Sequence, residues 1–258
     1  MSDDELVRER RGSVLVARLN RPAARNALSP SLMNAIGAAL LEGESDQGIR
    51  AVVLTGTGDR AFCAGMDMQQ FTDGEEMVPS DDQSAQAFYR FLRGEVGVPV
   101  VGAANATAVA GGFELLLGCD VIVASSAAKF GLPEVKRGLF PAGGGTRLGT
   151  RIPLSVALEM VLTGDSIDAG RAYELGLVNT VVAPDEVLPT AISYAERITV
   201  NGPLGVAAGK ELVRLGIADP ARAEERLRQL QVEVFASQDA REGALAFLEK
   251  RSPDWQGR

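Results

Sequence analysis

Glu114 occupies a stretch of the chain where a charged side chain is unexpected. The segment from Ala103 to Asp120 reads AANATAVAGGFELLLGCD, and no charged residue occurs between Glu95 and Glu114. A carboxylate in apolar surroundings has a partner, stays protonated or performs chemistry, because burying an unpaired charge is costly. The bland alternative is a glutamate that caps the N-terminus of its own helix. Glu114 is therefore a candidate acid–base residue.

The residues around Glu114 predict a strand, a tight glycine turn and then a buried helix. The run 98–101 favours a strand, Gly111 and Gly112 favour the turn, and the apolar run 113–117 favours the helix. The Gly111 amide would then lie at a helix N-terminus, where it has no partner within the helix. It would point toward whatever binds there, close to the Glu114 carboxylate.

Composition narrows the chemistry further. The chain has 258 residues, 46% of them hydrophobic, which is enough for one large core or one domain with an appendage. Its net charge of −8 disfavours nucleic acid as a partner. The sequence contains no histidine, which excludes histidine triads, imidazole catalysis and most zinc sites. Acid–base chemistry is left to carboxylates, lysine, tyrosine or cysteine.

The two cysteines and the N-terminus indicate where the protein works. Cys63 and Cys119 are too few and too far apart for a metal cluster or a disulfide framework, so we expect buried free thiols in a reducing compartment. The N-terminal MSDDELVRERRG lacks the apolar segment of a signal peptide. No run of about twenty apolar residues could span a bilayer. We therefore expect a soluble cytoplasmic protein with no membrane partner.

Hydrophobic periodicity predicts an α/β core over residues 1–190 and a helical region over 191–258. Strands are predicted over 5–9, 13–19, 51–56, 98–101, 121–124, 128–130 and 178–182. A helix is predicted to begin with Ser29 as N-cap and Pro30 in its first turn. Residues 68–95 favour a loop and a helix that together form a pocket lid. Further helices are predicted over 153–162, 168–175, 188–198, 204–215, 222–235 and 240–250.

Two glycine-rich segments imitate nucleotide-binding motifs without fulfilling them. Gly56, Gly58 and Ala61 resemble a dinucleotide fingerprint, but the residues that follow favour an extended or turning segment instead of the amphipathic helix that such a site needs. That segment is either a surface turn or a ligand site lined by backbone. The segment PAGGGT over 141–146 is not followed by lysine, so it is not a phosphate-binding P-loop.

Four segments in order resemble the crotonase superfamily, the enoyl-CoA hydratase/isomerase family. They are NRPAARNAL at 20–28, AFCAGMD at 61–67, NATAVAGGFELLLGCD at 105–120 and AKFGLPEVKRGLFPAGGGTRL at 128–148. The ending EGALAFLEKRSP at 242–253 fits as well, so the resemblance covers nearly the whole chain. Departures are Asn105-Ala106 for the usual NG, Ala110 for the first glycine of GGG, and Leu132 where a polar residue is common.

This resemblance implies the fold and the assembly. It implies a crotonase-type spiral of repeated ββα units, followed by a C-terminal helical region that mediates trimer formation. The expected partners are an acyl-CoA thioester and further copies of the chain, in a homotrimer or a dimer of trimers. Coenzyme A would be part of the substrate, so no separate cofactor and no metal is expected.

The resemblance also implies the site residues, which are carried over by position. The backbone amides of Met66 and Gly111 would form an oxyanion hole, while Glu114 and Glu134 would hold the catalytic water. Two carboxylates at one water can divide the work, since one accepts a proton and the other delivers one. Burial and like charge would raise the pKa of at least one of them. The residues expected to bind CoA are Ala24, Arg25, Ala64, Asp67, Phe247 and Lys250.

The expected activity is hydration of a trans-2-enoyl-CoA to a 3-hydroxyacyl-CoA. Isomerases of the family usually keep one glutamate of the pair, so the presence of both favours a hydratase. A double-bond isomerase and a non-catalytic acyl-CoA binder on the same fold are the alternatives. For Glu134 taken alone, the competing interpretation is a surface glutamate after a proline turn. The identity of the acyl chain cannot be read from the sequence.

Overall fold

The computed structural model describes residues 4–73 and 83–258, and its centre is a six-stranded sheet in the order β1-β2-β3-β4-β6-β9. β1 pairs antiparallel with β2, and the other neighbours are parallel. A smaller sheet has the order β5-β7-β8. The strands are β1 (Leu6–Arg11), β2 (Val14–Leu19), β3 (Ala51–Gly56), β4 (Val100–Ala104), β5 (Ala108–Val109), β6 (Val121–Ser125), β7 (Lys129–Gly131), β8 (Ser166–Asp168) and β9 (Thr180–Val182).

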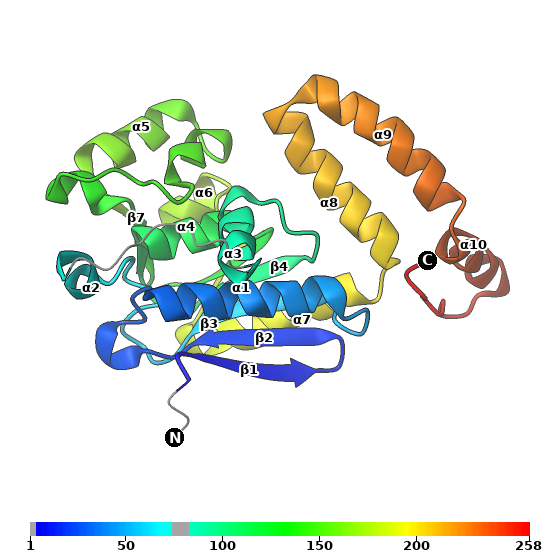
Figure 1. Ribbon diagram of the computed structural model, residues 1–258, viewed down its shortest axis with the longest axis horizontal. Coiled ribbons are helices and arrows are strands. Elements are labelled where there is room, and N and C mark those ends of the chain that lie inside the picture. Colours follow the sequence, from blue (N-terminus) through cyan, green and yellow to red (C-terminus); the bar gives the residue numbers. More distant parts are fainter. Residues whose placement is uncertain (1–3, 74–82) are drawn as a thin grey trace.

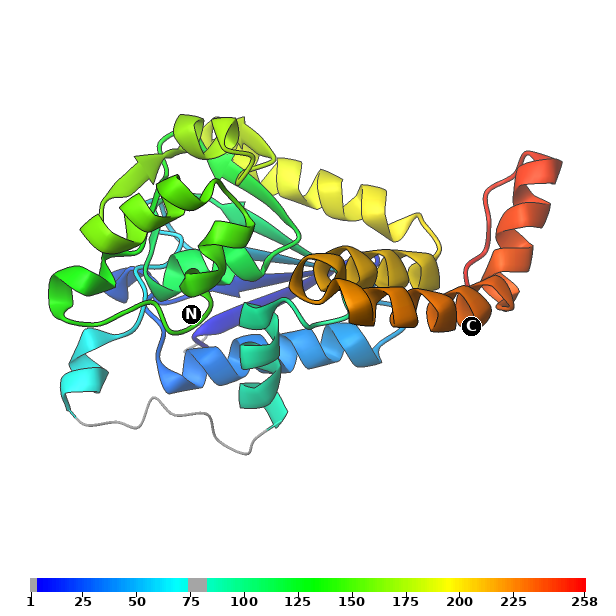
Figure 2. The same cartoon turned by 90° about the horizontal axis from the view of Figure 1, so that it is seen from above.

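Helices cover both faces of the large sheet (Figure 2). Val52 and Leu54 of β3 point into the core shared with α1, α3 and α4, whereas Val53 points toward α7 on the opposite face. The strands are therefore apolar on both sides, as expected for a mainly parallel sheet. The helices are α1 (Pro30–Ser45), α2 (Met68–Thr72), α3 (Gln83–Arg93), α4 (Gly111–Gly118), α5 (Leu154–Thr163), α6 (Ala169–Glu174), α7 (Val187–Thr199), α8 (Pro203–Ala218), α9 (Pro220–Phe235) and α10 (Gln238–Glu249), and the 3-10 segments are η1 (Pro22–Ala24), η2 (Pro133–Arg137), η3 (Gly145–Thr150) and η4 (Pro184–Glu186).

Local signals in the sequence set several of these boundaries. The Ser29 hydroxyl accepts a hydrogen bond from the Leu32 amide at 3.0 Å, and Pro30 occupies the first helical position of α1. This confirms the predicted start, because serine satisfies an amide that has no partner within the helix. Cys63 and Cys119 are buried free thiols, as predicted, and burial raises the pKa of each to about 12.

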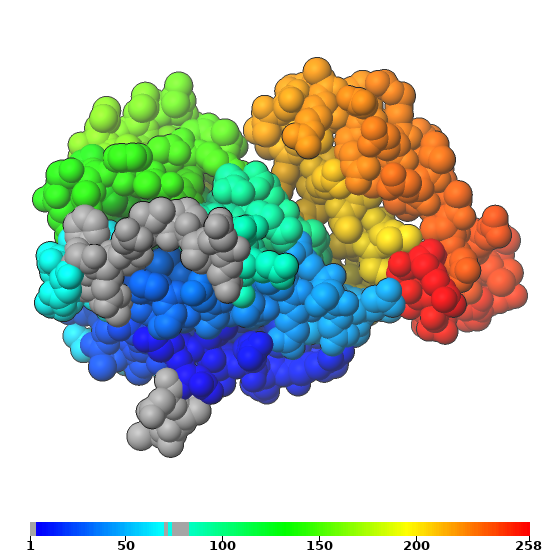
Figure 3. Space-filling view, in the orientation of Figure 1, coloured from blue at the N-terminus to red at the C-terminus, as the bar shows by residue number. Residues whose placement is uncertain are grey.

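Helices α8, α9 and α10 form an arm that projects from the core (Figures 1 and 3). The Trp255 indole donates to the Val200 carbonyl at 2.8 Å, and Arg50 donates to the Trp255 carbonyl at 2.8 Å, so the last residues tie the arm to the core. The predicted boundary at 190 falls inside α7, which packs on the sheet. The arm exposes large apolar side chains: Val213, Ile217, Leu227, Val232, Phe235, Leu245, Phe247 and Leu248.

The structure corrects the expected elements in a few places. The strands β5 and β8 were not predicted, because two or three residues carry no readable alternation. The last helix was expected to include Lys250, but Lys250 is the left-handed C-cap of α10 with a φ of 57°. Part of the predicted lid, residues 74–82, lies outside the described residues. Across the described ranges, every helix is too short or too polar to traverse a bilayer.

Candidate active site

A cavity of about 640 Å³ lies between the N-terminus of α4, helix α3 and the segment that follows β7. Its walls are mostly apolar side chains, and its polar groups include the carboxylates of Glu114 and Glu134. The apolar lining consists of Leu28, Met33, Met66, Met68, Phe88, Leu92, Val109, Leu139 and Phe140. An apolar pocket with a few convergent polar groups is the usual form of a small-molecule site.

Two backbone amides face this cavity from neighbouring segments. The Leu28 amide donates to the Gly65 carbonyl at 2.8 Å, and the Asp67 amide donates to the Leu28 carbonyl at 2.9 Å. Met66 lies between these two bonds, so its own N–H points away from Leu28. Within the described residues, neither the Met66 amide nor the Gly111 amide donates to a protein acceptor. A Cβ added to Gly111 would lie 3.7 Å from the Met66 nitrogen, so the two donors share one space.

The N-cap of α4 holds the Gly111 amide in place. Ala110 has φ 51° and ψ −134°, a conformation that a residue with a Cβ rarely adopts. Its amide donates to the Gly131 carbonyl at 2.9 Å, which joins the N-cap to β7. The departure from the family's GGG thus places an alanine where glycine would be unstrained, and such strain costs about 1–3 kcal/mol.

Replacing Ala110 with glycine should stabilise the fold. Relief of backbone strain outweighs the extra flexibility of glycine in the unfolded chain, about 0.5–1 kcal/mol, so we expect a net gain of about 1 kcal/mol. Chemical denaturation measures this change. Ala104→Gly in the buried strand β4 is the control and should destabilise, because no strain is relieved there. A loss of stability in Ala110→Gly similar to that of the control would contradict this prediction.

Glu114 is held by a loop far along the chain and not by its own helix. Its Oε1 accepts hydrogen bonds from the Gly143 and Gly145 amides, each at 2.8 Å, and the residue is only 6% exposed. The hydrogen bonds of a capping glutamate are not seen, because the amide of the N-cap residue Ala110 donates to the Gly131 carbonyl and not to Glu114. Burial raises the pKa of Glu114, and the amides of Gly145, Gly143 and Gly144 partly offset that effect.

Glu134 lies in the first turn of η2 and lines the same cavity. Its Oε2 is buried and has no hydrogen-bond partner within the described residues. Burial raises the pKa of Glu134, and the negative charge of Glu114 raises it further, while a hydrogen bond from the backbone amide of Glu134 itself and the charge of Arg137 act in the opposite direction. A buried carboxylate oxygen without a hydrogen-bond partner costs stability when the group is ionised, and such a group is suited to carry a proton.

Glu134→Gln should increase thermal stability at neutral pH and not at acidic pH. Because the folded-state pKa is raised, ionisation of Glu134 costs stability as the pH rises from its ordinary pKa of 4.5 through the folded-state value. Glutamine resembles the protonated acid and removes that cost. The difference in Tm between variant and wild type should be near zero below pH 4.5 and positive above the folded-state pKa. A difference in Tm that does not vary with pH would contradict this prediction. Glu95→Gln, at an exposed position, is the control.

Similarity to known proteins shows the family of this chain. The sequence profile of the enoyl-CoA hydratase/isomerase family matches residues 9–258. The chain belongs to this family. It is 40% identical over 264 residues to enoyl-CoA hydratase EchA19 of Mycobacterium tuberculosis, covering 99% of this chain and 97% of that protein. It is 38% identical over 258 residues to 2,3-dehydroadipyl-CoA hydratase of Escherichia coli, covering 98% and 99%.

A solved structure confirms the crotonase-type fold. The crystal structure of an enoyl-CoA hydratase from Mycobacterium tuberculosis superposes with a TM-score of 0.90 at 40% identity, and the match covers 99% of this chain and 100% of that one. The chain therefore has the fold that the resemblance implied, a crotonase-type core followed by a C-terminal helical region.

The residues expected to bind CoA lie in two separate places. Ala64 lines the cavity, and its amide donates to the Arg25 carbonyl at 3.1 Å, which brings the exposed Ala24 and Arg25 close to the mouth. Phe247, 83% exposed, belongs to α10, and Lys250 is the C-cap of that helix. Helix α10 lies at the opposite end of the molecule from α2 (Figure 1). One chain therefore does not bring these two residues to its own cavity.

Asp67 takes part in a contact that the sequence did not predict. Its carboxylate pairs with Arg21 at 2.9 Å, and Arg21 also donates to the Ala27 carbonyl at 2.6 Å. This ion pair fastens the segment that carries the Met66 amide to the residues before α1. The contact joins residues far apart in the chain, so no local pattern could reveal it. The described residues contain no group of three or more Cys, Asp or Glu side chains that could hold a metal ion.

Proposed function

We propose that this chain adds water to a trans-2-enoyl-CoA thioester and releases a 3-hydroxyacyl-CoA. The observation that carries the proposal is the convergence of two carboxylates, Glu114 and Glu134, and two amides, those of Met66 and Gly111, on one apolar cavity. The names of the relatives support it, since EchA19 is named an enoyl-CoA hydratase and the Escherichia coli relative is named a hydratase of 2,3-dehydroadipyl-CoA.

The proposed chemistry follows from the positions of these groups. The thioester oxygen accepts hydrogen bonds from the Met66 and Gly111 amides, which stabilise the negative charge that develops on it. Water attacks C3, and one of the glutamates accepts its proton. The other glutamate delivers a proton to C2, so that the elements of one water molecule add across the double bond. On this proposal the reaction needs no cofactor besides the CoA portion of the substrate.

The raised pKa values of the two carboxylates suit this division of labour. An acid must hold its proton near neutral pH, and burial raises the pKa of both carboxylates, while the charge of Glu114 raises the pKa of Glu134 further. The hydrogen bonds from Gly143 and Gly145 favour the ionised form of Glu114. The pair can therefore hold one proton and one negative charge at the same time.

An assay with crotonyl-CoA tests the proposal against its alternatives. A hydratase removes the conjugated double bond, so the absorbance of the enoyl thioester disappears. A double-bond isomerase leaves crotonyl-CoA unchanged but converts a 3-enoyl-CoA into the conjugated product. A non-catalytic binder changes neither substrate while still binding CoA. A panel of enoyl-CoA substrates with short, long, branched, aromatic and sterol-derived chains then identifies the acyl group.

We further propose that the arm assembles copies of the chain into a homotrimer or a dimer of trimers, and that Phe247 and Lys250 contact CoA within that assembly. The exposed apolar side chains of α8, α9 and α10 support this proposal, because such surfaces are normally covered. A cytoplasmic location is likewise proposed, supported by the free thiols of Cys63 and Cys119.

Removing residues 240–258 should weaken CoA binding and disrupt assembly together. The truncation deletes most of α10 and the Trp255 contacts that tie the arm to the core. Analytical ultracentrifugation and CoA titration measure the two effects. Lys250→Ala is the matched control and should weaken CoA binding while the oligomer stays intact. An unchanged oligomer with full CoA affinity in the truncated chain would contradict this proposal.

A further inference from the structure

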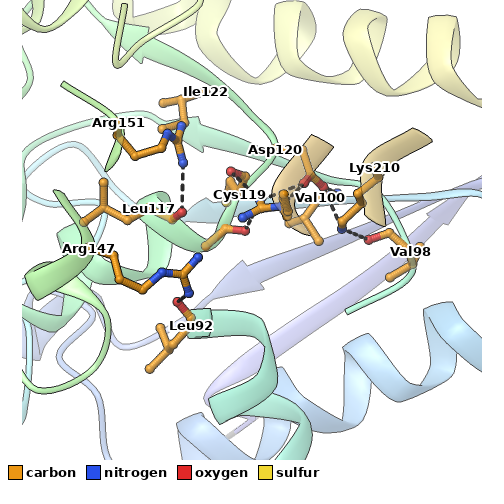
Figure 4. A network of polar contacts seen from close by, with 12 residues as sticks. Leu92, Val98, Val100, Leu117, Cys119, Asp120, Ile122, Arg147, Arg151 and Lys210 are labelled. Carbon is orange, nitrogen blue, oxygen red and sulfur yellow. Dashed lines mark hydrogen bonds and ion pairs between the residues drawn. The ribbon is translucent and has the colours of Figure 1, made fainter. Parts of the chain in front are cut away.

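Helix α4 carries site groups in its first turn, and its other end is bonded by arginines. The Gly111 amide and the Glu114 carboxylate belong to that first turn. At the last turn, Arg151 donates to the Leu117 carbonyl at 3.0 Å (Figure 4). Arg214 of α8 donates to the carbonyls of Gly118 and Cys119 at 3.0 and 3.2 Å. The last carbonyls of a helix lack internal partners and carry partial negative charge, which favours cations there.

The two arginines differ in how their charges are balanced. Arg214 pairs with Asp120 at 2.7 Å, and Lys210 of α8 pairs with the same carboxylate at 2.8 Å. Arg151 is partly buried, yet in the described residues it has no carboxylate within ion-pair distance. The partial negative charge of the last carbonyl groups of α4 therefore takes the place of an ion-pair partner for Arg151.

The chain segment that ends at Arg151 begins with the amides that hold Glu114. Gly143 and Gly145 donate to Glu114 at one end of this segment, and η3 then leads directly to Arg151, which donates to Leu117. The segment is therefore attached to α4 at two points, one in the first turn and one in the last. Fixing the second point limits how far the first can shift along the helix.

We propose that Arg151 is a positioning residue for Glu114, and that it acts by anchoring the 143–151 segment to the C-terminal carbonyls of α4. Through this anchor the Gly143 and Gly145 amides stay aligned with the Glu114 carboxylate. The other titratable groups that line the cavity are Glu134 and Arg137 from η2 and Tyr89 from α3. The inference rests on the proposed function, because it takes Glu114 as part of the acid–base pair.

Steady-state kinetics of Arg151→Gln, Arg151→Lys and Arg147→Gln across a range of pH test this role. Arg151→Gln should lower kcat by about tenfold to a hundredfold with little change in KM, because misplacement of a reacting group by about 1 Å costs this much. One limb of its kcat/KM profile should move to higher pH, since lost amide bonds raise the pKa of Glu114. Arg151→Lys keeps a cationic donor and should recover most of the rate.

Arg147→Gln is the matched control from the same segment. Arg147 is exposed and donates to the Leu92 carbonyl of α3, so its loss should leave kcat within about twofold of wild type. A lowered Tm in Arg151→Gln with wild-type kcat and an unshifted pH profile would show a merely structural role and overturn the inference. Equal losses in Arg147→Gln and Arg151→Gln would also overturn it. Failure of the proposed function is seen separately, as full activity in Glu114→Gln.

Discussion

Glu114→Gln and Glu134→Gln should each lower the rate of crotonyl-CoA hydration by about 10²–10⁴-fold, the range typical of positioned acid–base groups. Glutamine has almost the volume of glutamate, so packing around the cavity is preserved while proton transfer is lost. The 6% exposure of Glu114 makes this close match in size important. Measuring kcat for both variants, with Glu95→Gln on the surface as the control, gives the result directly.

The double variant shows whether the two glutamates act together in one reaction or independently. Groups that act as a unit are strongly non-additive, so Glu114→Gln combined with Glu134→Gln should be little worse than the poorer single variant. An isomerase predicts that one substitution abolishes activity and the other is nearly silent. A binder predicts no turnover in wild type and little change in CoA affinity. A nearly silent Glu134→Gln would overturn the hydratase proposal in favour of the isomerase.

Gly111→Val should abolish most of the hydration rate while the fold survives. The new Cβ would lie 3.1 Å from Leu28 Cδ1 and 3.7 Å from the Met66 nitrogen, so the valine side chain would hinder access of the thioester oxygen to the proposed oxyanion donors. Loss of one such donor costs about 10²–10³-fold in kcat. Gly111 is not among the residues with positive φ, so valine introduces no backbone strain of that kind.

Circular dichroism together with kcat separates the two effects of this substitution. Gly170→Val in α6 is the control, because a Cβ there meets only the Asp168 carboxylate oxygen at 3.4 Å. We expect that control to keep both fold and rate. A Gly111→Val variant that turns over at nearly the wild-type rate would show that the thioester oxygen binds elsewhere.

Features of the site that depend on neighbouring residues could be predicted from the sequence. Glycines followed by an apolar run place Gly111 at the start of α4, and the structure begins the helix at that residue. The absence of charge before Glu114 indicated a buried carboxylate, which the structure confirms. The Ser29 and Pro30 signal located the start of α1. In each case the residues that cause the feature are close together in the sequence.

Features that depend on distant residues could not be predicted in this way. Glycines 143 and 145 were recognised as part of a segment without a P-loop lysine and of a segment that resembles the family, but neither pattern showed that their amides donate to Glu114. The Arg21 pair with Asp67 and the Arg151 bond to Leu117 join segments that are adjacent only in the folded chain. Phe247 and Lys250 belong to α10 and its C-cap, and the cavity lining includes no residue of that helix, which no pattern within one helix reveals.

Mass spectrometry of the product formed from crotonyl-CoA in ¹⁸O-labelled water tests the central proposal most directly. Hydration at the cavity of Glu114 and Glu134 predicts an intact CoA thioester that has gained one water molecule and carries a single ¹⁸O atom in its hydroxyl group. The same incubation with the double glutamine variant should yield almost none of this product. An unlabelled thioester of unchanged mass, or free CoA with the label in a released acid, would contradict the proposal.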